Sequence, residues 1–527
     1  MKTQTLKVIL TILVTISVFI AGTVIAMPIL KKKDVSVAKD QTEQIKRSYA
    51  NEDTSTSETQ EITRDYEIKT EETWDISKNG DGSVTAKWTL SDRTLRISGS
   101  GEMKDWEELL VGDWHETQYT RIIESIIIKD GVTSVGYGAF YKCNNLTNII
   151  IPNSVTTIGE GSFSECTSLI NISIPDSVTT INDGAFYGCT KLISIIIPSS
   201  VKSIGEAAFG ECSSLTNITI SDGVNNIKDG AFYRCSNLTD IVIPSSITSI
   251  GEVIFDDCYN LKQIKVDQNK PNYLDENGIL YNKDKTKIMC YPAGKLENEF
   301  KIPNSVIKIG EHAFQKCSRL TKIEIPNSVT SMGDSVFADC INLENVKIPD
   351  SITNIGWCAF AGCSSLKNIE IPNSVTSISD YAFDECTRLT DITIPESVTS
   401  IKNGAFCNCS SLTGIEIPES VTSIGENIVS DNTIIYAKAD SEAHQYAEKN
   451  KMGYIIIKIR LKGYSIVNNY IVKIKPNTTY NEFIKDIQTN QEYTIKEGNK
   501  TIGGTDLIKT GQELTTQSGA QYILVVI

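Results

Sequence analysis

Cysteine is the residue type whose spacing most invites a chemical interpretation in this chain. Of the 14 cysteines, most recur at a step of 23 residues, interrupted once by a longer step. We call these the ladder cysteines: Cys143, Cys166, Cys189, Cys212, Cys235, Cys258, Cys317, Cys340, Cys363, Cys386 and Cys409. A disulfide framework shows irregular spacings matched to loops, and a zinc site gathers its ligands at short spacing. The regular step fits neither chemistry.

Free cysteine behaves as a small residue that is often buried. We therefore predict that the ladder cysteines form one row of free thiols in a core, with occasional oxidation between neighbours left open. Cys290, Cys358 and Cys407 lie off this ladder. The short pair Cys407 and Cys409 is too little for a metal site, so we predict no metal and no cofactor.

The candidates for acid–base chemistry are few. The three histidines are His115, His312 and His444, and His312 stands at a repeat position that elsewhere holds Gly, Ala, Val, Ser, Cys or Tyr. That variety predicts a tolerant surface site rather than a general base. The sequence contains no nucleophile elbow, no Walker loop and no HExxH. We predict no catalytic residues and no enzyme activity.

Four carboxylates gather within a short stretch: Asp267, Asp275, Glu276 and Asp284. A pair of carboxylates is what glycoside hydrolysis requires. The sequence gives no separation between them, and a solvated acidic loop is the simpler interpretation.

The element that positions these residues is a repeat. Residues 369–391 read IEIPNSVTSISDYAFDECTRLTD, and 323–345 read IEIPNSVTSMGDSVFADCINLEN. Counting Ile126 as position 1, units begin every 23 residues to Ile241 and again from Phe300 to Ile415. Positions 1 and 3 are apolar, position 4 is usually Pro, position 15 is Phe and position 21 is Leu.

This pattern predicts a strand with one buried face at positions 1 to 3, ended by a proline that cannot donate to a ladder. The Ala-Phe segment is expected to be helical or 3₁₀. One unit cannot bury its apolar face alone, so stacking should join all units into one continuous core.

The unit IVIPSSITSIGEVIFDDCYNLKQI at 241–264 resembles the BspA-like leucine-rich repeat of bacterial surface proteins. The resemblance implies a curved solenoid that serves binding or adhesion, and it carries no catalytic motif. The region from Trp74 to Trp114 resembles the cap that precedes such arrays, 271–295 resembles the family's long repeat, and 440–454 its closing helix. Residues 455–527 resemble a small β module found before dockerins.

The predicted fold class is therefore an α/β repeat solenoid, with an N-terminal β cap and a small C-terminal β-rich domain. The expected domains are a signal peptide or signal anchor at 1–30, a disordered stalk at 31–61, the cap at 62–125, the solenoid at 126–437 with a longer unit at 264–299, a closing helix at 438–454 and the β-rich module at 455–527.

The N-terminal segment predicts export. Val8 to Leu30 is uncharged and mostly apolar, long enough to span a bilayer, which needs about 20 residues. Val24 to Ala26 is a small-residue pattern typical of cleavage. The segment is either removed at Ala26 or retained as an anchor, and both place the remainder outside the cytoplasm. We expect an extracellular or cell-surface protein that contacts a membrane only through this segment.

The formal net charge of −15 argues against nucleic acid as a partner, because phosphate binding needs a basic face.

The candidate binding residues stand at position 2, which should point outward from each strand. In the first half of the array these residues are mainly apolar, and in the second half they are mostly charged. The candidates are Ile127, Ile150, Ile196, Thr219 and Val242. A contiguous exposed apolar stripe marks a possible protein partner site, although β-propensity or cover by the N-terminal module would also explain it.

The predicted function is protein binding or adhesion, with a partner on a host, a neighbouring cell or the envelope. The alternative is an accessory protein of a polysaccharide-degrading system that binds a glycan or the cell wall. Tyr141, Tyr187 and Tyr233 at position 16 offer a partial aromatic row for sugars, interrupted by Ser164 and Gly210. From Lys301 to Glu370, position 2 alternates in sign, which predicts cross-strand pairs.

Overall fold

The structure is a computed structural model that describes residues 68–106, 118–269 and 272–456, and beyond these only eight short strands between 460 and 526. The predicted signal segment at 1–30 and the stalk at 31–61 lie outside the described residues. Within the described part, no helix is both long and apolar enough to cross a bilayer.

The chain begins its described part with three antiparallel strands, β1 (Glu71–Asp75), β2 (Val84–Thr89) and β3 (Thr94–Gly99). Strand β3 pairs in parallel with β5 (Ser125–Ile128) of the first coil. Trp88 fills the space under this cap and is fully buried. The antiparallel strands thus cover the first coil, and the pairing of β3 with β5 aligns them with the strands of the array.

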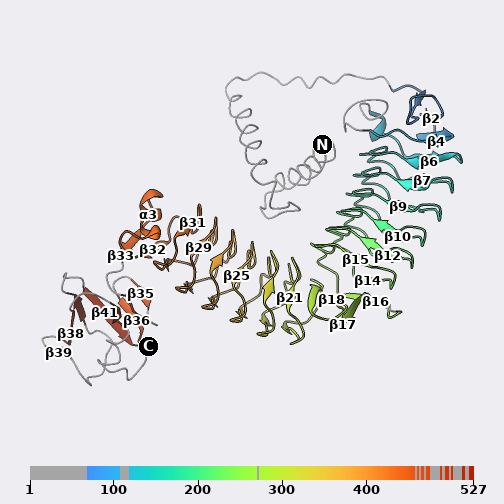
Figure 1. The fold of residues 1–527 in the computed structure, drawn as a ribbon. Coiled ribbons are helices and arrows are strands. Elements are labelled where there is room, and N and C mark those ends of the chain that lie inside the picture. The colour runs from blue at the N-terminus through green and yellow to red at the C-terminus, as the bar shows by residue number, and fades with distance from the viewer. Residues whose placement is uncertain are drawn as a thin grey trace, which may run out of the picture. The chain divides into compact units, whose positions relative to one another are not determined.

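Most coils of the array contribute two short strands, which pair in parallel with the equivalent strands of neighbouring coils (Figure 1). In the coil that begins at Ile172, the first strand is reduced to a single bridge between Asn171 and Ser194. The register steps by one repeat, as in Ile195 opposite Ile218 and Ile204 opposite Ile227. The strands that contain positions 1 and 2 are β5, β7 (Asn148–Ile150), β10 (Ser194–Ile197), β12 (Asn217–Ile220), β14 (Asp240–Ile243), β16 (Gln263–Val266), β20 (Glu299–Lys301), β22 (Lys322–Glu324), β24 (Asn345–Lys347), β26 (Asn368–Glu370), β28 (Asp391–Thr393) and β30 (Gly414–Glu416). Two further strands, β32 (Ile434–Ala437) and β33 (Tyr454–Ile456), continue this sheet at the end of the array.

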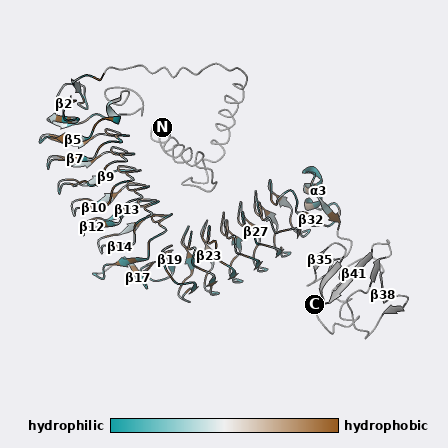
Figure 2. Ribbon diagram, turned by 180° about the vertical axis from the view of Figure 1, so that it is seen from behind, coloured by the Kyte–Doolittle hydropathy of each residue, from teal (hydrophilic) through white to brown (hydrophobic). Residues whose placement is uncertain are grey.

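The second strand of each coil includes the apolar residue at position 10. These strands are β6 (Val132–Val135), β8 (Thr157–Ile158), β9 (Thr180–Ile181), β11 (Ser203–Ile204), β13 (Asn226–Ile227), β15 (Ser249–Ile250), β21 (Lys308–Ile309), β23 (Ser331–Met332), β25 (Asn354–Ile355), β27 (Ser377–Ile378), β29 (Ser400–Ile401) and β31 (Ser423–Ile424). The cap strand β4 (Gly101–Glu102) pairs with β6 and begins this second sheet. Apolar and polar segments recur from coil to coil in Figure 2. The predicted repeat solenoid is confirmed.

The interior is built from three aligned rows. The Phe side chains at position 15 stack on one another, for example Phe186 on Phe209 with ring centroids 5.3 Å apart and planes within 5°. Leu at position 21 and the ladder cysteines are buried beside them. All 11 ladder cysteines are free and buried, which confirms the prediction of a thiol row.

The thiols also make a regular polar contact that hydrophobic packing alone does not predict. Nine of them donate to the carbonyl of a Phe one coil earlier, as Cys212 Sγ does to Phe186 O at 3.2 Å, and Cys317 donates to Tyr291 O at 3.7 Å. The same carbonyl accepts the backbone N–H of Cys189 at 3.2 Å. Because buried carbonyls need hydrogen-bond partners, the thiol is matched to this position by more than its size.

The expectation of a helical or 3₁₀ Ala-Phe segment is wrong. The segment is a series of turns, in which positions 13 and 17 adopt the left-handed conformation, as at Gly138 (φ 62°) and Lys142 (φ 59°). Left-handed residues interrupt a helix. Backbone N–H groups of this segment instead donate to carbonyl groups of the next coil, as Phe140 N does to Ser162 O at 2.8 Å. Glycine occurs often at position 13 because it adopts this conformation without strain.

The longer unit replaces a coil by three strands: β17 (Tyr273–Glu276), β18 (Ile279–Asn282) and β19 (Lys287–Cys290). Strands β17 and β18 form an antiparallel hairpin, and β19 pairs with β21 of the next coil. The prediction of one continuous core is wrong at this place. The core consists of two clusters, from Ile76 to Leu280 and from Ile279 to Ala447, because the hairpin interrupts the stacking of identical coils.

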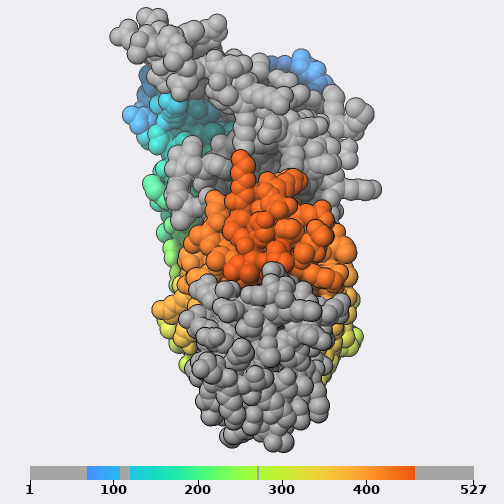
Figure 3. All heavy atoms as spheres, turned by 90° about the vertical axis from the view of Figure 1, so that its left-hand side faces the viewer, coloured from blue at the N-terminus to red at the C-terminus, as the bar shows by residue number. Residues whose placement is uncertain are grey.

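The array closes with β32, helix α3 (Glu442–Lys449) and β33. Ser441 caps α3 by accepting the N–H of His444, and Ala443 and Ala447 are buried against the last coil. Figure 3 shows this last segment as a closely packed group of side chains at the end of the array.

The C-terminal strands are β34 (Arg460–Leu461), β35 (Ser465–Val467), β36 (Tyr470–Ile474), β37 (Ile487–Gln488), β38 (Tyr493–Glu497), β39 (Lys500–Ile502), β40 (Glu513–Thr516) and β41 (Gln521–Val526). Six of them form one sheet in the order β35-β36-β41-β40-β38-β39.

Candidate functional site

The five candidate residues lie on successive strand-bearing coils and share one face. Ile127 stands opposite Ile150, and Ile196 stands opposite Thr219. Ile150, Ile196 and Val242 expose 51%, 65% and 52% of their surface. Ile127 is half-buried, and Thr219 is exposed. We call these five residues the apolar row.

The strand pleat explains why these side chains point outward. Successive side chains of a strand alternate between its faces. In β10, Ile195 and Ile197 are 3% and 0% exposed, and Ile196 between them is 65% exposed. Two of three isoleucines therefore build the core, while the third is left for solvent or a partner.

Two further apolar residues widen the row and were missed from the sequence. Ile170 and Ile193, at position 22 of neighbouring units, are 40% and 47% exposed. They lie on adjacent coils, since Ile193 N donates to Ile170 O at 3.1 Å. The signal was present, because position 22 elsewhere holds Thr, Lys or Glu. With Ile150 and Ile196, they form a patch centred on three coils.

The same row is charged in the second half of the array. Lys301 Nζ lies 3.6 Å from Glu324, and Lys322 lies 3.1 Å from the same carboxylate. Lys347 stands opposite both Glu324 and Glu370 in the strand register. The predicted alternation thus produces an ion pair between Lys301 and Glu324. The face changes from apolar to charged at the longer unit.

A polar group marks the end of the apolar row nearest the longer unit. The carboxylate of Asp240 accepts hydrogen bonds from Gln263 Nε2 at 2.6 Å and Thr239 Oγ1 at 2.7 Å. These bonds, led by that from Gln263, hold the pKa of Asp240 below its ordinary value. A fixed negative charge therefore stands beside Val242 and Lys265 at this end of the row.

The tyrosines proposed as a sugar platform are engaged in packing. Tyr141, Tyr187 and Tyr233 are only partly exposed. A Cβ on Gly210 would come within 2.9 Å of the Tyr187 ring, so the small residue makes room for it. Burial raises the pKa of Tyr187 above its ordinary value. The aromatic row alternates with small residues because each ring extends over the next coil.

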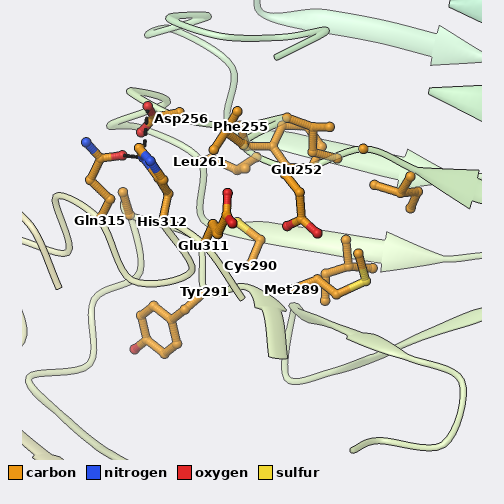
Figure 4. Close-up of a pocket in the computed structure, with 16 residues that line it drawn as sticks. Glu252, Phe255, Asp256, Leu261, Met289, Cys290, Tyr291, Glu311, His312 and Gln315 are labelled. Carbon is orange, nitrogen blue, oxygen red and sulfur yellow. Dashed lines mark hydrogen bonds and ion pairs between the residues drawn. The ribbon is translucent and has the colours of Figure 1, made fainter. Parts of the chain in front are cut away.

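His312 is not the tolerant surface residue that was predicted. Its side chain is 9% exposed, and Nδ1 lies 3.3 Å from the carboxylate of Asp256 and 2.5 Å from the Gln315 amide. Figure 4 shows His312 between these two residues at the edge of a pocket. The backbone of position 13 is left-handed (φ 54° at His312), and at this unit the side chain that replaces glycine turns inward to contact Asp256.

The carboxylates of the acidic stretch make local contacts that stabilise the turns of the longer unit. Asp275 Oδ1 accepts Val266 N at 2.8 Å, and Asp267 Oδ1 accepts Asn269 N at 3.0 Å. Glu276 pairs with Lys285. Each carboxylate is thus held apart in its own local contact. In the described residues, no three His, Cys, Asp or Glu side chains gather in a way that would hold a metal ion.

A polar groove of about 390 Å³ opens where the cap meets the first coils. Its lining includes the ion pair of Lys78 with Glu102, and also Asp105, Tyr137 and Glu160. Burial raises the pKa of Tyr137 to about 12. Small-molecule sites have volumes in this range.

The comparisons with known proteins agree with this geometry. A family model described as the BspA type leucine rich repeat region matches residues 117–205, 179–282, 289–386 and 333–450. No curated protein sequence matches the chain.

Three solved structures show the same architecture. A leucine rich cell surface protein from Faecalibacterium prausnitzii is 34% identical, with a TM-score of 0.54 over 64% of this chain and 93% of that one. A leucine-rich repeat protein from Eubacterium ventriosum is 27% identical, with a TM-score of 0.53 over 69% and 95%. The pneumococcal vaccine antigen PcpA, 20% identical with a TM-score of 0.50 over 73% and 98%, shares the fold.

Proposed function

Because the chain belongs to the family of proteins with BspA-type leucine-rich repeats, we propose that it is a non-catalytic surface protein that binds a protein partner through the apolar row. The observation that carries this proposal is the exposure of Ile150, Ile196 and Val242 on one face, at 51%, 65% and 52%. A similar protein is described as a cell surface protein, which supports the same location for this chain.

The chemistry of the row favours a protein. Large apolar side chains held on a rigid sheet lose little conformational freedom when they are covered. Complete burial of one such side chain contributes about 1.5 to 3 kcal/mol. Because these three side chains already have about half of their surface buried, we expect about 1 kcal/mol from each. Ile170 and Ile193 on adjacent coils, 40% and 47% exposed, add further apolar surface that a partner could cover.

The experiment is a double substitution, Ile150→Glu with Ile196→Glu. Both side chains point away from the core, so the circular dichroism and melting temperature should remain as in the wild type. Partners are first captured from host and envelope extracts and identified by quantitative mass spectrometry, and the affinity of the purified partner is then measured. We expect the double variant to weaken binding at least 30-fold, which corresponds to about 2 kcal/mol.

Thr393→Lys is the matched control, because Thr393 is also an exposed position-2 residue of a strand but lies in the charged half, opposite Glu370 and Glu416. It should bind as the wild type does. Unchanged affinity in the double variant would defeat the proposal, as would an equal loss in the control.

Glycan binding is the second candidate, and the polar groove beside Tyr137 is the observation that favours it. Carboxylates and an aromatic edge are suitable for sugar hydroxyls and ring faces. A glycan array with the wild type and Asp105→Ala tests this function. Binding that Asp105→Ala removes, with the apolar row intact, would replace the first proposal.

We also propose that residues 1–30 direct export and then either leave at Ala26 or anchor the protein. Mass spectrometry of the mature N-terminus distinguishes the two outcomes.

A further inference from the structure

The interruption of the array at the longer unit has the properties of a joint. The stacked Phe row runs to Phe255 and starts again with Tyr291, which stacks on Phe314 at 5.1 Å. The sheet of second strands that begins at β4 ends at β15, and a new one includes β19 and β21. Both the core and the sheets therefore divide at this place.

The backbone links between coils are also missing on one side of the longer unit. In the preceding coil, the N–H groups of Gly230, Phe232 and Arg234 donate to Glu252, Ile254 and Asp256 at 2.8 to 3.2 Å. Over the described residues, no equivalent bond leaves Val253 or Phe255 for the longer unit. A cavity of about 30 Å³ lies there instead, bordered by Phe255, Cys290 and Tyr291 (Figure 4). That volume has room for one water molecule.

Ion pairs take the place of the missing ladder. Asp256 pairs with His312 at 3.3 Å, Asp257 with Lys316 at 2.5 Å, and Glu252 with Lys287 at 2.9 Å. Each pair connects the coil before the gap with the longer unit or the coil after it. The backbone bond from Gly294 N to Leu261 O at 2.8 Å also joins the two sides. On the face of the first strands, β14 still pairs with β16, and Asn272 Nδ2 donates to Ile247 O at 2.9 Å.

We propose that the longer unit is a pH-responsive joint between two rigid stretches of the solenoid, closed by the buried pair of His312 with Asp256. Of the crossing pairs, this one contains the group that titrates near neutral pH. The joint is closed more firmly when His312 carries its proton and loosens when the proton leaves.

The Gln315 amide lies against both members of the pair. With its nitrogen toward them, it donates to the carboxylate of Asp256. Loss of the His312 proton removes the attraction between the charges of His312 and Asp256, which is stronger at a site with little water.

The direction of the pH effect follows from the surroundings of His312. Burial acts to lower its pKa, but the hydrogen bond and charge of Asp256 outweigh burial and raise it above the ordinary value. The stabilisation is thus complete below the unfolded pKa and is lost as pH rises through the folded one. The pKa of Glu311 is raised by burial and then by Glu252 and Asp334, so acid favours closure there as well.

The charged and titratable groups that face the joint come from every coil packed at it. They are Glu252, Asp256 and Asp257 from the preceding coil, Lys287 and Cys290 from the longer unit, Glu311 and Lys316 from the coil of His312, and Asp334 from the next coil. Of these groups, His312 and Glu311 are the ones whose pKa the surroundings raise toward or above neutral conditions from an ordinary value below about pH 7, so both hold a proton more readily here than in the unfolded chain.

Hydrogen exchange of the full chain tests the joint, because Gly294 N–H makes the bond that crosses it. Exchange is measured by mass spectrometry at about pH 5.5 and pH 8 and corrected for intrinsic rates. We expect the protection of Gly294 to fall about fivefold at the higher pH, while a peptide covering 377–386 stays unchanged. His312→Gln should abolish the pH effect.

His444→Gln is the matched control, since His444 also lies near a carboxylate, Glu448 at 3.4 Å, but in α3. It should retain the wild-type response. A wild type with pH-independent protection at Gly294 overturns the proposal, and so does a His312→Gln protein with the full response. If His312→Gln does not fold, Asp256→Asn is used in its place. A full pH response in Asp256→Asn would also overturn the proposal.

Discussion

The stacked Phe row gives the most quantitative test of how the coils hold together. Phe186 is fully buried and stacks on both Phe163 and Phe209 with ring centroids 5.3 Å apart and planes at 5°. Parallel rings at that separation are offset, which is a favourable aromatic geometry. Phe186→Ala removes both contacts and leaves a void that the rigid neighbours cannot fill.

The magnitude follows from the number of neighbours. A buried Phe→Ala substitution costs about 3 to 5 kcal/mol, and each aromatic pair adds about 0.5 to 1.5 kcal/mol beyond burial. With two pairs lost, we expect about 5 kcal/mol at Phe186. Phe406 stacks on Phe383 alone, so Phe406→Ala should cost about 1 kcal/mol less.

Because each coil contacts only its neighbours, the loss should spread to adjacent coils and fade beyond them. Hydrogen exchange in rising urea measures local unfolding free energy coil by coil. Peptides that contain Phe163 and Phe209 should lose protection with Phe186→Ala, and those near Phe383 should not. Ile196→Ala, on an exposed residue, is the control and should cost less than about 0.5 kcal/mol. A cost below about 1 kcal/mol for Phe186→Ala would refute the stacking argument.

Two further outcomes are expected. Iodoacetamide at about pH 8 should modify the partly exposed Cys407 in the native protein but none of the 11 buried ladder thiols until denaturant is added. Burial raises the pKa of ladder thiols such as Cys189 to about 12 and also raises that of Cys358, so Cys358 should stay unlabelled as well. Peptide mass spectrometry reads this out, and early labelling of the ladder would contradict it. Asp257→Asn should lower the free energy of unfolding by about 3 kcal/mol, measured by thermal unfolding. Asp257 is 5% exposed and contacts both Arg234 and Lys316, so the substitution removes this carboxylate from two cations. Lys142→Gln removes an exposed ion pair and should cost less than about 0.5 kcal/mol.

Much of the fold followed from the periodicity of the sequence. The strand at positions 1 to 3, the buried Phe and the free thiols were predictable because identical units face identical neighbours. The thiol bond from Cys212 to Phe186 O was not, since it depends on where a backbone carbonyl of another coil points. The turns at Gly138 and Lys142 were mistaken for a helix. A left-handed residue is easy to predict where it is glycine, but Lys142 gives no such signal, because lysine is also common in helices.

The site was predictable only in part. Alternation along a strand placed Ile196 outward, and Ile170 and Ile193 were visible as departures at position 22. The joint was not predictable, because the sequence at His312 shows a variable position and its partner Asp256 lies 56 residues away. Only the geometry of the longer unit brings the two side chains together.

Carbene footprinting of the protein with and without its purified partner tests directly whether the apolar row is the binding surface. We expect partner binding to protect the side chains of Ile150, Ile196 and Val242, together with Ile170 and Ile193, and to leave the charged strands β22 to β26 labelled as before. Protection confined to those charged strands, or to the groove beside Tyr137, would contradict this expectation.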